Sequence, residues 1–312
     1  MTRGAPAPDR RPAGGRARTT PPALQPGTHQ LTWSTAELLR DLDVDNGWVL
    51  LIDGVPSSYV DLDAPTHLGF EYMAWIAGIL DSLAPAGAPL DTVHVGGGAC
   101  SMARYVAATR PKSRQLVLEL DPKLIELSRD LLSLRRTPLL RTKARDGREG
   151  LRKEPAASAD VVVRDAFDGL AVPAHLTTTG FLAEAKRVLR PGGAYVANLS
   201  GRAPFVEARR EAATALHSFA HVTLHSEPSV LRGRRNGNVI ITASDAPLPL
   251  DALLRRAAGG AAQARVLVGD RLTDFVGTAA PYEDPPAPTE GAGLADHEGG
   301  PGGVVDADDH VG

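Results

Sequence analysis

Three consecutive glycines, Gly96, Gly97 and Gly98, separate an apolar run at residues 92–95 from a segment at residues 101–109 that can form a helix. A second β-rich run follows at residues 115–120. Glycine allows the chain to reverse sharply and lets a ligand approach bare backbone, which a Cβ atom would obstruct. The order strand, glycine turn, helix, strand therefore predicts an α/β unit with a ligand crevice at the turn.

Two further features of this unit indicate the kind of ligand. The helix after the glycines would point its free N–H groups and positive dipole end into the crevice. Glu119 follows at the end of the second strand, where a carboxylate can accept two hydrogen bonds from ribose hydroxyls. The dinucleotide pattern G-x-G-x-x-G is absent, because Ser101 stands where its last glycine would be. We therefore predict a nucleoside ligand.

Apolar runs alternate with helical segments through the middle of the chain, and seven of them read as strands: 92–95, 115–120, 139–144, 160–164, 194–199, 221–225 and 238–243. This alternation predicts a doubly wound α/β domain, a Rossmann-like parallel sheet with helices on both faces. Ligands on such sheets bind at the carboxyl ends of the strands. Four polar features fall at those ends: the glycine turn, Glu119, the Asp146-Gly147 pair, and the segment from Asp165 to Asp168.

The flanking segments differ from the middle of the chain in composition. Residues 1–30, rich in Pro, Gly and Arg, predict a disordered basic tail, and residues 281–312, without Lys or Arg, predict a disordered acidic one. Residues 31–85 predict a β-hairpin with an Asp53-Gly54 turn, then a helix at 66–83. Residues 86–245 would form the nucleoside-binding catalytic domain, and residues 246–280 a closing region.

Composition excludes several classes of protein. A net charge of −3 with 4% aromatic residues argues against a nucleic-acid binder. A single cysteine, Cys100, excludes a disulfide framework and any zinc site built from cysteines, and it reads as a packing residue. None of the nine histidines has a metal-binding spacing, so we predict no metal. No apolar run approaches membrane-spanning length, which predicts a soluble, cytoplasmic protein without a membrane partner.

Five segments together resemble the spermidine synthase family of aminopropyltransferases, which has the class I S-adenosylmethionine-dependent methyltransferase fold: VHVGGG, LELDPKLIELSR, ARDGREGL, VVVRDAFDG and FLAEAKRVLRPGGAYVANL. The resemblance covers residues 48–243. It implies a seven-stranded methyltransferase-type sheet, a small N-terminal β-hairpin element and a homodimer. It also implies transfer of an aminopropyl group from decarboxylated S-adenosylmethionine to an amine in polyamine biosynthesis, with methylthioadenosine as by-product.

The resemblance also implies roles for individual residues. The three glycines would approach the nucleoside and the sulfonium, and Glu119 would hold the ribose hydroxyls at the strand end that includes Asp121. Asp146 and Gly147 would meet the adenine. Asp165 would be the base at the attacking amine and would border the donor, with Asp168 as its neighbour. On the substrate side stand two residues in places where the family has other types, Ser57 and His67.

One departure leaves the function open. The family's glycine loop continues with an aspartate that binds the donor's amine, whereas this chain has Ala99, whose methyl group cannot accept a hydrogen bond. Three hypotheses follow. The chain is an aminopropyltransferase that uses other residues, an S-adenosylmethionine-dependent methyltransferase on the same fold, or a non-catalytic module that binds S-adenosylmethionine or methylthioadenosine.

Overall fold

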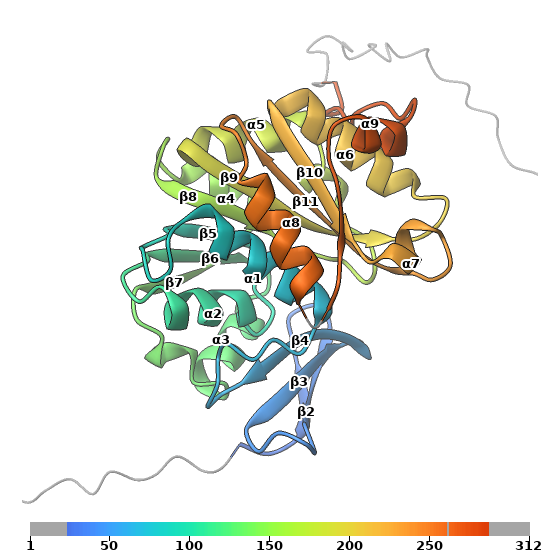
Figure 1. The fold of residues 1–312 in the computed structure, drawn as a ribbon. Coiled ribbons are helices and arrows are strands. Elements are labelled where there is room, and N and C mark those ends of the chain that lie inside the picture. The colour runs from blue at the N-terminus through green and yellow to red at the C-terminus, as the bar shows by residue number, and fades with distance from the viewer. Residues whose placement is uncertain (1–23, 261, 287–312) are drawn as a thin grey trace, which may run out of the picture.

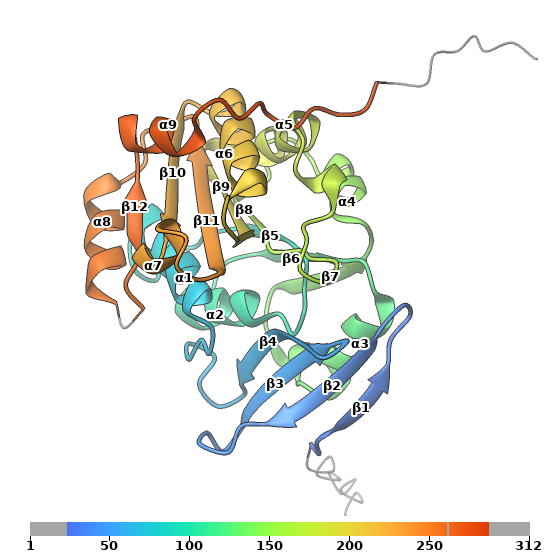
Figure 2. The same cartoon turned by 90° about the vertical axis from the view of Figure 1, so that its right-hand side faces the viewer.

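The computed structural model describes residues 24–260 and 262–286, which form a large mixed sheet covered by helices and a smaller antiparallel sheet (Figure 1). The large sheet has eight strands in the order β12-β10-β11-β9-β8-β5-β6-β7. The four strands of the small sheet run in the order β1-β2-β3-β4. Figure 2 shows the small sheet, in blue, lying below the large one.

The strands of the small sheet are β1 Gly27–Gln30, β2 Thr35–Arg40, β3 Gly47–Ile52 and β4 Val55–Asp61. Those of the large sheet are β5 Thr92–Val95, β6 Gln115–Glu119, β7 Leu140–Ala144, β8 Ala159–Arg164, β9 Leu189–Gly201, β10 His221–Ser226, β11 Gly237–Ser244 and β12 Arg265–Leu267. The α-helices are α1 Glu71–Leu83, α2 Ser101–Thr109, α3 Pro122–Asp130, α4 Gly147–Lys153, α5 Thr179–Val188, α6 Val206–Ser218, α7 Pro228–Leu231, α8 Leu250–Gly259 and α9 Asp270–Val276. Two 3₁₀ helices span Leu134–Arg136 and Ala174–Leu176.

The doubly wound α/β class is confirmed, and the sheet differs in two details from the parallel, seven-stranded one that we expected. Strands β5 to β9 are parallel, whereas β11 pairs antiparallel with both β9 and β10. Only a short connection with the four-residue helix α7 links β10 to β11. Such a connection is too short for a parallel crossover, so the chain reverses. An eighth strand, β12, comes from the predicted closing region and pairs with β10.

Both faces of the large sheet are buried. Along β8, Val162 belongs to an apolar cluster with side chains of α5 and α6, whereas Val161 and Val163 belong to a second cluster with side chains of α1, α2 and α8. Successive side chains of a strand point to opposite faces, so a continuous apolar run supplies both clusters. The helices thus cover both faces, and polar groups gather at the two ends of the strands.

The N-terminal element is larger than predicted. The β3–β4 hairpin is present, and Asp53 and Gly54 at its turn both have positive φ, as a two-residue turn of type I′ requires. The two strands β1 and β2 extend it into a sheet, and β1 lies within the segment that we predicted to be a disordered tail. Thr32, just after β1, anchors it by donating backbone and hydroxyl hydrogen bonds to Asp121. Residues 1–23 of that tail lie outside the described residues.

The predicted acidic tail also begins with an ordered segment. Asp284 pairs with Arg148 and accepts a hydrogen bond from Thr178, and the backbone carbonyl of Tyr282 accepts from the N–H of Thr179 at 2.8 Å. The guanidinium of Arg148 lowers the pKa of Asp284 to about 2. An ion pair and a helix N-terminus hold the Asp284 carboxylate in place. Composition alone does not reveal such contacts, so it predicted disorder here. Residues 287–312 of this tail lie outside the described residues.

Helix α1 begins at Glu71, five residues after the start of the helix predicted at residues 66–83. The carboxylate of Asp61 accepts hydrogen bonds from the backbone N–H groups of Asp63 and Ala64, which folds the linker into a turn. A side chain that offers the backbone such bonds competes with helix formation. Helix α1 then packs against α8, so the closing region lies over the first helix.

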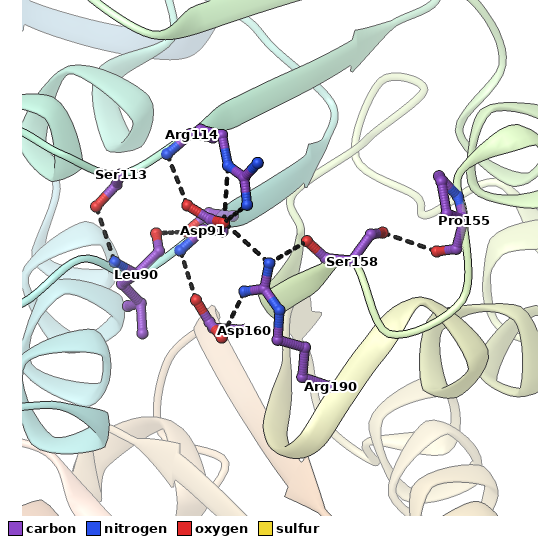
Figure 3. Close-up of polar contacts among 9 residues, drawn as sticks. Leu90, Asp91, Ser113, Arg114, Pro155, Ser158, Asp160 and Arg190 are labelled. Atoms are coloured by element: carbon purple, nitrogen blue, oxygen red, sulfur yellow. Dashed lines mark hydrogen bonds and ion pairs between the residues drawn. The ribbon is translucent and has the colours of Figure 1, made fainter.

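Ion pairs fasten the amino edge of the large sheet, as Figure 3 shows. Asp91, just before β5, accepts from the backbone N–H of Arg114 at 2.8 Å and from its guanidinium at 2.7 Å. Arg190, at the start of β9, bridges Asp91 at 3.0 Å and Asp160 at 2.7 Å, and donates to the carbonyl of Ser158 at 2.8 Å. These bonds tie the beginnings of β5, β6, β8 and β9 together, at the edge opposite the glycine loop.

Candidate active site

The glycine loop after β5 lies between the end of β8 and the small sheet. Gly96 has a φ of +92°, and a Cβ atom there would come within 2.2 Å of the carbonyl oxygen of Asp165. Gly98 has a φ of +49°, and its Cβ would come within 2.4 Å of the Ser58 hydroxyl oxygen. Both the backbone conformation and the lack of space therefore require glycine. The loop holds the start of α2, the end of β8 and strand β4 in direct contact.

Glu119, the last residue of β6, turns its carboxylate to this loop. Its Oε2 accepts a hydrogen bond from the N–H of Gly97 at 2.8 Å and a longer one from Gly98 at 3.4 Å, and its Oε1 accepts from the N–H of Asp121 at 2.9 Å. Burial raises the pKa of Glu119, and these N–H groups oppose that shift. Oε1 accepts only one of these bonds, and one of the two to Oε2 is long, so both oxygens keep some acceptor capacity. They can accept hydrogen bonds from vicinal hydroxyls.

Asp121 accepts its hydrogen bonds from groups of the protein itself. It caps α3 by accepting from the N–H groups of Lys123 and Leu124 at 2.8 and 3.3 Å, and it accepts the two bonds from Thr32, each at 2.8 Å. These bonds occupy both carboxylate oxygens. We therefore attribute to Asp121 the joining of α3 to the small sheet and leave it out of the ligand contacts proposed below.

Asp146 and Gly147 lie at the start of α4, beyond the end of β7. Asp146 caps α4 through the N–H groups of Arg148 and Glu149 at 2.9 and 3.0 Å, and its other oxygen lies 2.6 Å from Nε2 of His175. Burial opposes ionisation, but the hydrogen bonds from the helix and His175 outweigh it and hold the pKa of Asp146 below its usual range. Gly147 packs on β5, because a Cβ there would be 2.3 Å from Val95.

Asp165 follows β8 directly, and two side chains hold its carboxylate by hydrogen bonds. Its N–H donates to the carbonyl of Val95 at 2.9 Å, so it lies beside Gly96 on the neighbouring strand. Its Oδ2 accepts from the Tyr72 hydroxyl at 3.1 Å, and its Oδ1 accepts from Nδ2 of Asn198 at 2.8 Å. Burial raises the pKa of Asp165 above its usual range despite these two bonds.

Sequence reasoning missed Tyr72 and Asn198, and also Asn238, which donates to Oδ1 of Asn198 at 3.0 Å. Aromatic residues at helical spacing, as in α1, are typical of a core, so the pattern gives no signal for Tyr72. For Asn198 a signal was present, since a single asparagine interrupts the apolar run of β9 and is only 1% exposed. A buried amide needs hydrogen-bond partners, and such a residue next to a candidate carboxylate indicates a polar network.

Three predicted site residues remain: Asp168, Ser57 and His67. Asp168 is exposed, and its backbone forms a bridge with Ala171. The hydroxyl of Ser57 donates to the carbonyl of Val55 at 2.9 Å, on the strand that packs against the glycine loop. His67 places Nδ1 3.2 Å from Asp61 and its ring against Tyr59, so its described contacts are with β4 and not with Asp165.

Ala99 and Cys100 close the loop without offering a polar side chain to a ligand. Ala99 is 0% exposed, and its N–H donates to the Ser58 hydroxyl at 3.0 Å. Cys100 packs among apolar side chains, and burial raises the pKa of its thiol to about 12. A thiol that stays protonated is a poor nucleophile. The reading of Cys100 as a packing residue agrees with this environment.

Residues 24–260 and 262–286 contain neither a candidate metal cluster nor a candidate membrane span. Within these ranges no cluster of three or more His, Cys, Asp or Glu side chains has the arrangement of a metal site. The described helices include none that is both long and apolar enough to cross a membrane.

Comparison with known proteins places this geometry in a family. No model of a known protein family matches the chain. A curated polyamine aminopropyltransferase of Chromobacterium violaceum is 29% identical over 145 residues, which cover 45% of this chain and 53% of that protein. The chain thus spans about half the length of the curated relatives that it matches.

Solved structures extend the similarity over nearly the whole described chain. A spermidine synthase from Thermotoga maritima shares the fold, with a TM-score of 0.54 and 19% identity over 72% of this chain and 74% of that one. A probable spermidine synthase from Corynebacterium glutamicum has a TM-score of 0.78 and 36% identity, over 86% of this chain and 98% of that one. The resemblance found in the sequence is thereby confirmed, and the chain belongs to the spermidine synthase family.

Proposed function

We propose that this chain transfers an aminopropyl group from decarboxylated S-adenosylmethionine to an amine in polyamine biosynthesis and releases methylthioadenosine. The observation that carries the proposal is the position of Asp165. Its carboxylate is partly buried, held by Tyr72 and Asn198, and its backbone touches Gly96 of the loop that would receive the donor. A candidate base and a candidate donor loop therefore adjoin on neighbouring strands.

The donor half of the proposed site is the glycine loop with Glu119. The glycines are partly accessible and stand where a side chain would collide with the protein, and Glu119 is held by three backbone N–H groups with acceptor capacity left. This arrangement suits the ribose of a nucleoside. We assign the adenine to the start of α4, where Asp146 and Gly147 lie beyond the same edge of the sheet.

The reaction requires little from the protein beyond positioning and proton control. The attacking nitrogen forms a bond to the propyl carbon, the bond from that carbon to sulfur breaks, and its electron pair neutralises the sulfonium. The nitrogen must be unprotonated to attack, and it must lose a proton afterwards. Asp165 is the proposed acceptor of that proton, with exposed Asp168 attracting the cationic substrate. The raised pKa of Asp165 brings it closer to that of a useful base near neutral pH.

We also propose that the enzyme is a cytoplasmic homodimer. Trp33 and Leu42, in loops of the small sheet, are 67% and 95% exposed, and a partner subunit would cover such side chains. Light scattering during size-exclusion chromatography tests this. A monomer at micromolar concentration would refute the dimer without touching the proposed reaction.

The proposed reaction is tested by incubating the purified chain with decarboxylated S-adenosylmethionine and a panel of aliphatic diamines. We expect methylthioadenosine, detected by chromatography, together with an amine heavier by one aminopropyl group, detected by mass spectrometry. In a parallel incubation with S-adenosylmethionine, methylated product and S-adenosylhomocysteine would instead show a methyltransferase, the second hypothesis that Ala99 leaves open. Nucleoside binding without product from any amine would show a non-catalytic module.

A further inference from the structure

A chain of oriented hydrogen bonds runs from β11 through β9 to Asp165. Asn238 donates through Nδ2 to Oδ1 of Asn198 at 3.0 Å, and Asn198 donates through Nδ2 to Oδ1 of Asp165 at 2.8 Å. Asn198 is 1% exposed, and Asn238 is partly buried. Two residues from strands other than β8 thus complete the surroundings of the Asp165 carboxylate.

Strand register explains why these two amides meet. In the antiparallel pair of β9 and β11, Asn198 faces Ile240 and Asn238 faces Ser200. Asn198 and Asn238 are therefore diagonal neighbours on one face of the sheet, within reach of each other's side chains. Strand β8 is parallel to β9 on its other side, with Arg164 beside Ala197, so Asp165 emerges next to Asn198. Asn238 reaches Asn198 because β11 runs antiparallel to β9.

The donor and acceptor chemistry of the three side chains determines the direction of these hydrogen bonds. An ionised carboxylate can only accept hydrogen bonds, so Asn198 must present its NH₂ group to Asp165. The carbonyl oxygen of Asn198 then faces Asn238, which must present its own NH₂ group. If Asn198 turned over, it would oppose two oxygens at one end and two donors at the other. Asn238 therefore supports the orientation in which the NH₂ group of Asn198 meets the carboxylate.

We propose that Asn198 and Asn238 are positioning residues, which orient the Asp165 carboxylate toward the acceptor amine and favour its ionised form. The proposal rests on the proposed function, since it assumes that Asp165 meets that amine. Neither amide needs to touch the substrate. Asn238 acts only through Asn198, which makes it the more informative residue to change.

Ionisation of Asp165 depends on few neighbours. Burial raises its pKa, and three groups oppose this: the amide of Asn198 from β9, the hydroxyl of Tyr72 from α1, and the charge of Arg164 from β8. The charge of Arg164 is largely engaged by Glu211 at 2.6 Å. Removal of the amide donor should therefore raise the pKa of Asp165 further, and the acid limb of the pH–rate profile should move to higher pH.

Asn238→Asp is the sharpest test, because it keeps the shape and replaces a donor with an acceptor. The new carboxylate would compete with Asp165 for the NH₂ group of Asn198, so the amide oxygen of Asn198 would face one of the two carboxylates. We expect kcat to fall by about tenfold or more, the acid limb of kcat/KM to move to higher pH, and methylthioadenosine affinity to stay within about twofold of wild type. Exposed Asn236 lies two residues away, so Asn236→Asp is the matched control for added charge.

Carbon-13 NMR of the Asp165 carboxyl gives a readout that does not need catalysis. We expect its titration to move to higher pH in Asn238→Asp and, by less, in Asn238→Ala, which serves if the aspartate variant does not fold. An unchanged titration and an unchanged pH–rate profile in a folded variant would overturn the inference, as would an equal shift in Asn236→Asp. Wild-type protein without product would refute the proposed function instead, while the NMR shift would still report on the amide chain.

Discussion

Glu119→Gln tests the nucleoside site at its most defined point. The substitution exchanges one carboxylate oxygen for an NH₂ group, which only donates. In the wild type each oxygen accepts from a backbone N–H, from Gly97 at 2.8 Å and from Asp121 at 2.9 Å. One of these N–H groups must therefore lose its acceptor, whichever way the new amide turns.

Two opposing effects set the loss of stability. An unsatisfied buried N–H costs about 1–3 kcal/mol. Glutamine, in contrast, avoids the burial of charge that raises the pKa of Glu119. We expect a net decrease in the free energy of unfolding of about 1 kcal/mol, or a fall in Tm of about 2–4 °C.

Ligand affinity should change by much more than stability. A ribose hydroxyl that loses a charged acceptor loses about 1.5–3 kcal/mol, which corresponds to a roughly 10- to 100-fold higher Kd. Calorimetric titration with methylthioadenosine measures this loss. Glu126→Gln is the control, because Glu126 is exposed on α3 and carries the same charge. If folded Glu119→Gln bound within twofold of the wild type, Glu119 would not be the ribose acceptor.

Three further predictions concern other carboxylates and the amino edge of the sheet. Asp165→Asn should lower kcat by about 100-fold or more in the product assay, yet be at least as stable as wild type at pH 7. Because the pKa of Asp165 is raised in the folded state, its ionisation at pH values above the usual aspartate pKa destabilises the fold, and asparagine lacks this penalty. A large loss of stability in Asp165→Asn would contradict this. Arg190→Ala should lower the free energy of unfolding by about 1–3 kcal/mol in urea titrations and leave methylthioadenosine affinity unchanged, whereas weaker binding would mean that the ion pairs shape the site. The pKa of Asp284 is lowered to about 2, so its contribution to stability is complete above the usual aspartate range and disappears as pH falls toward 2. Wild type and Asp284→Asn should therefore differ in Tm at pH 6 and converge in acid, and a constant difference would refute the role of the Arg148 pair.

The sequence predicted the parts of the site that depend on neighbours along the chain. A strand, three glycines and a helix form one local unit, so the loop and the place of Glu119 follow from pattern alone. The place of Asp165 was also predicted, because an acidic residue directly after a buried strand must lie at the carboxyl ends of the strands. These inferences needed only the periodicity of strands and the conformational freedom of glycine.

The groups that hold Asp165 could not be predicted in the same way. Tyr72 is 93 residues away in the chain, and its contact depends on where α1 begins, which the linker turn at Asp61 delays. Asn238 reaches Asn198 only because β11 is antiparallel to β9 with one particular register. Alternation of strands and helices does not reveal the direction of a strand. Long-range register is thus the information that the sequence pattern lacked.

The central claim is that this site receives the decarboxylated donor. Its most direct test is a side-by-side calorimetric titration of the purified chain with decarboxylated S-adenosylmethionine, S-adenosylmethionine and methylthioadenosine. Our account predicts that the decarboxylated donor and methylthioadenosine bind more tightly than S-adenosylmethionine, because Asp165 and Asp168 would repel a carboxylate on the donor. Tighter binding of S-adenosylmethionine would contradict the account and would make methyl transfer the better proposal.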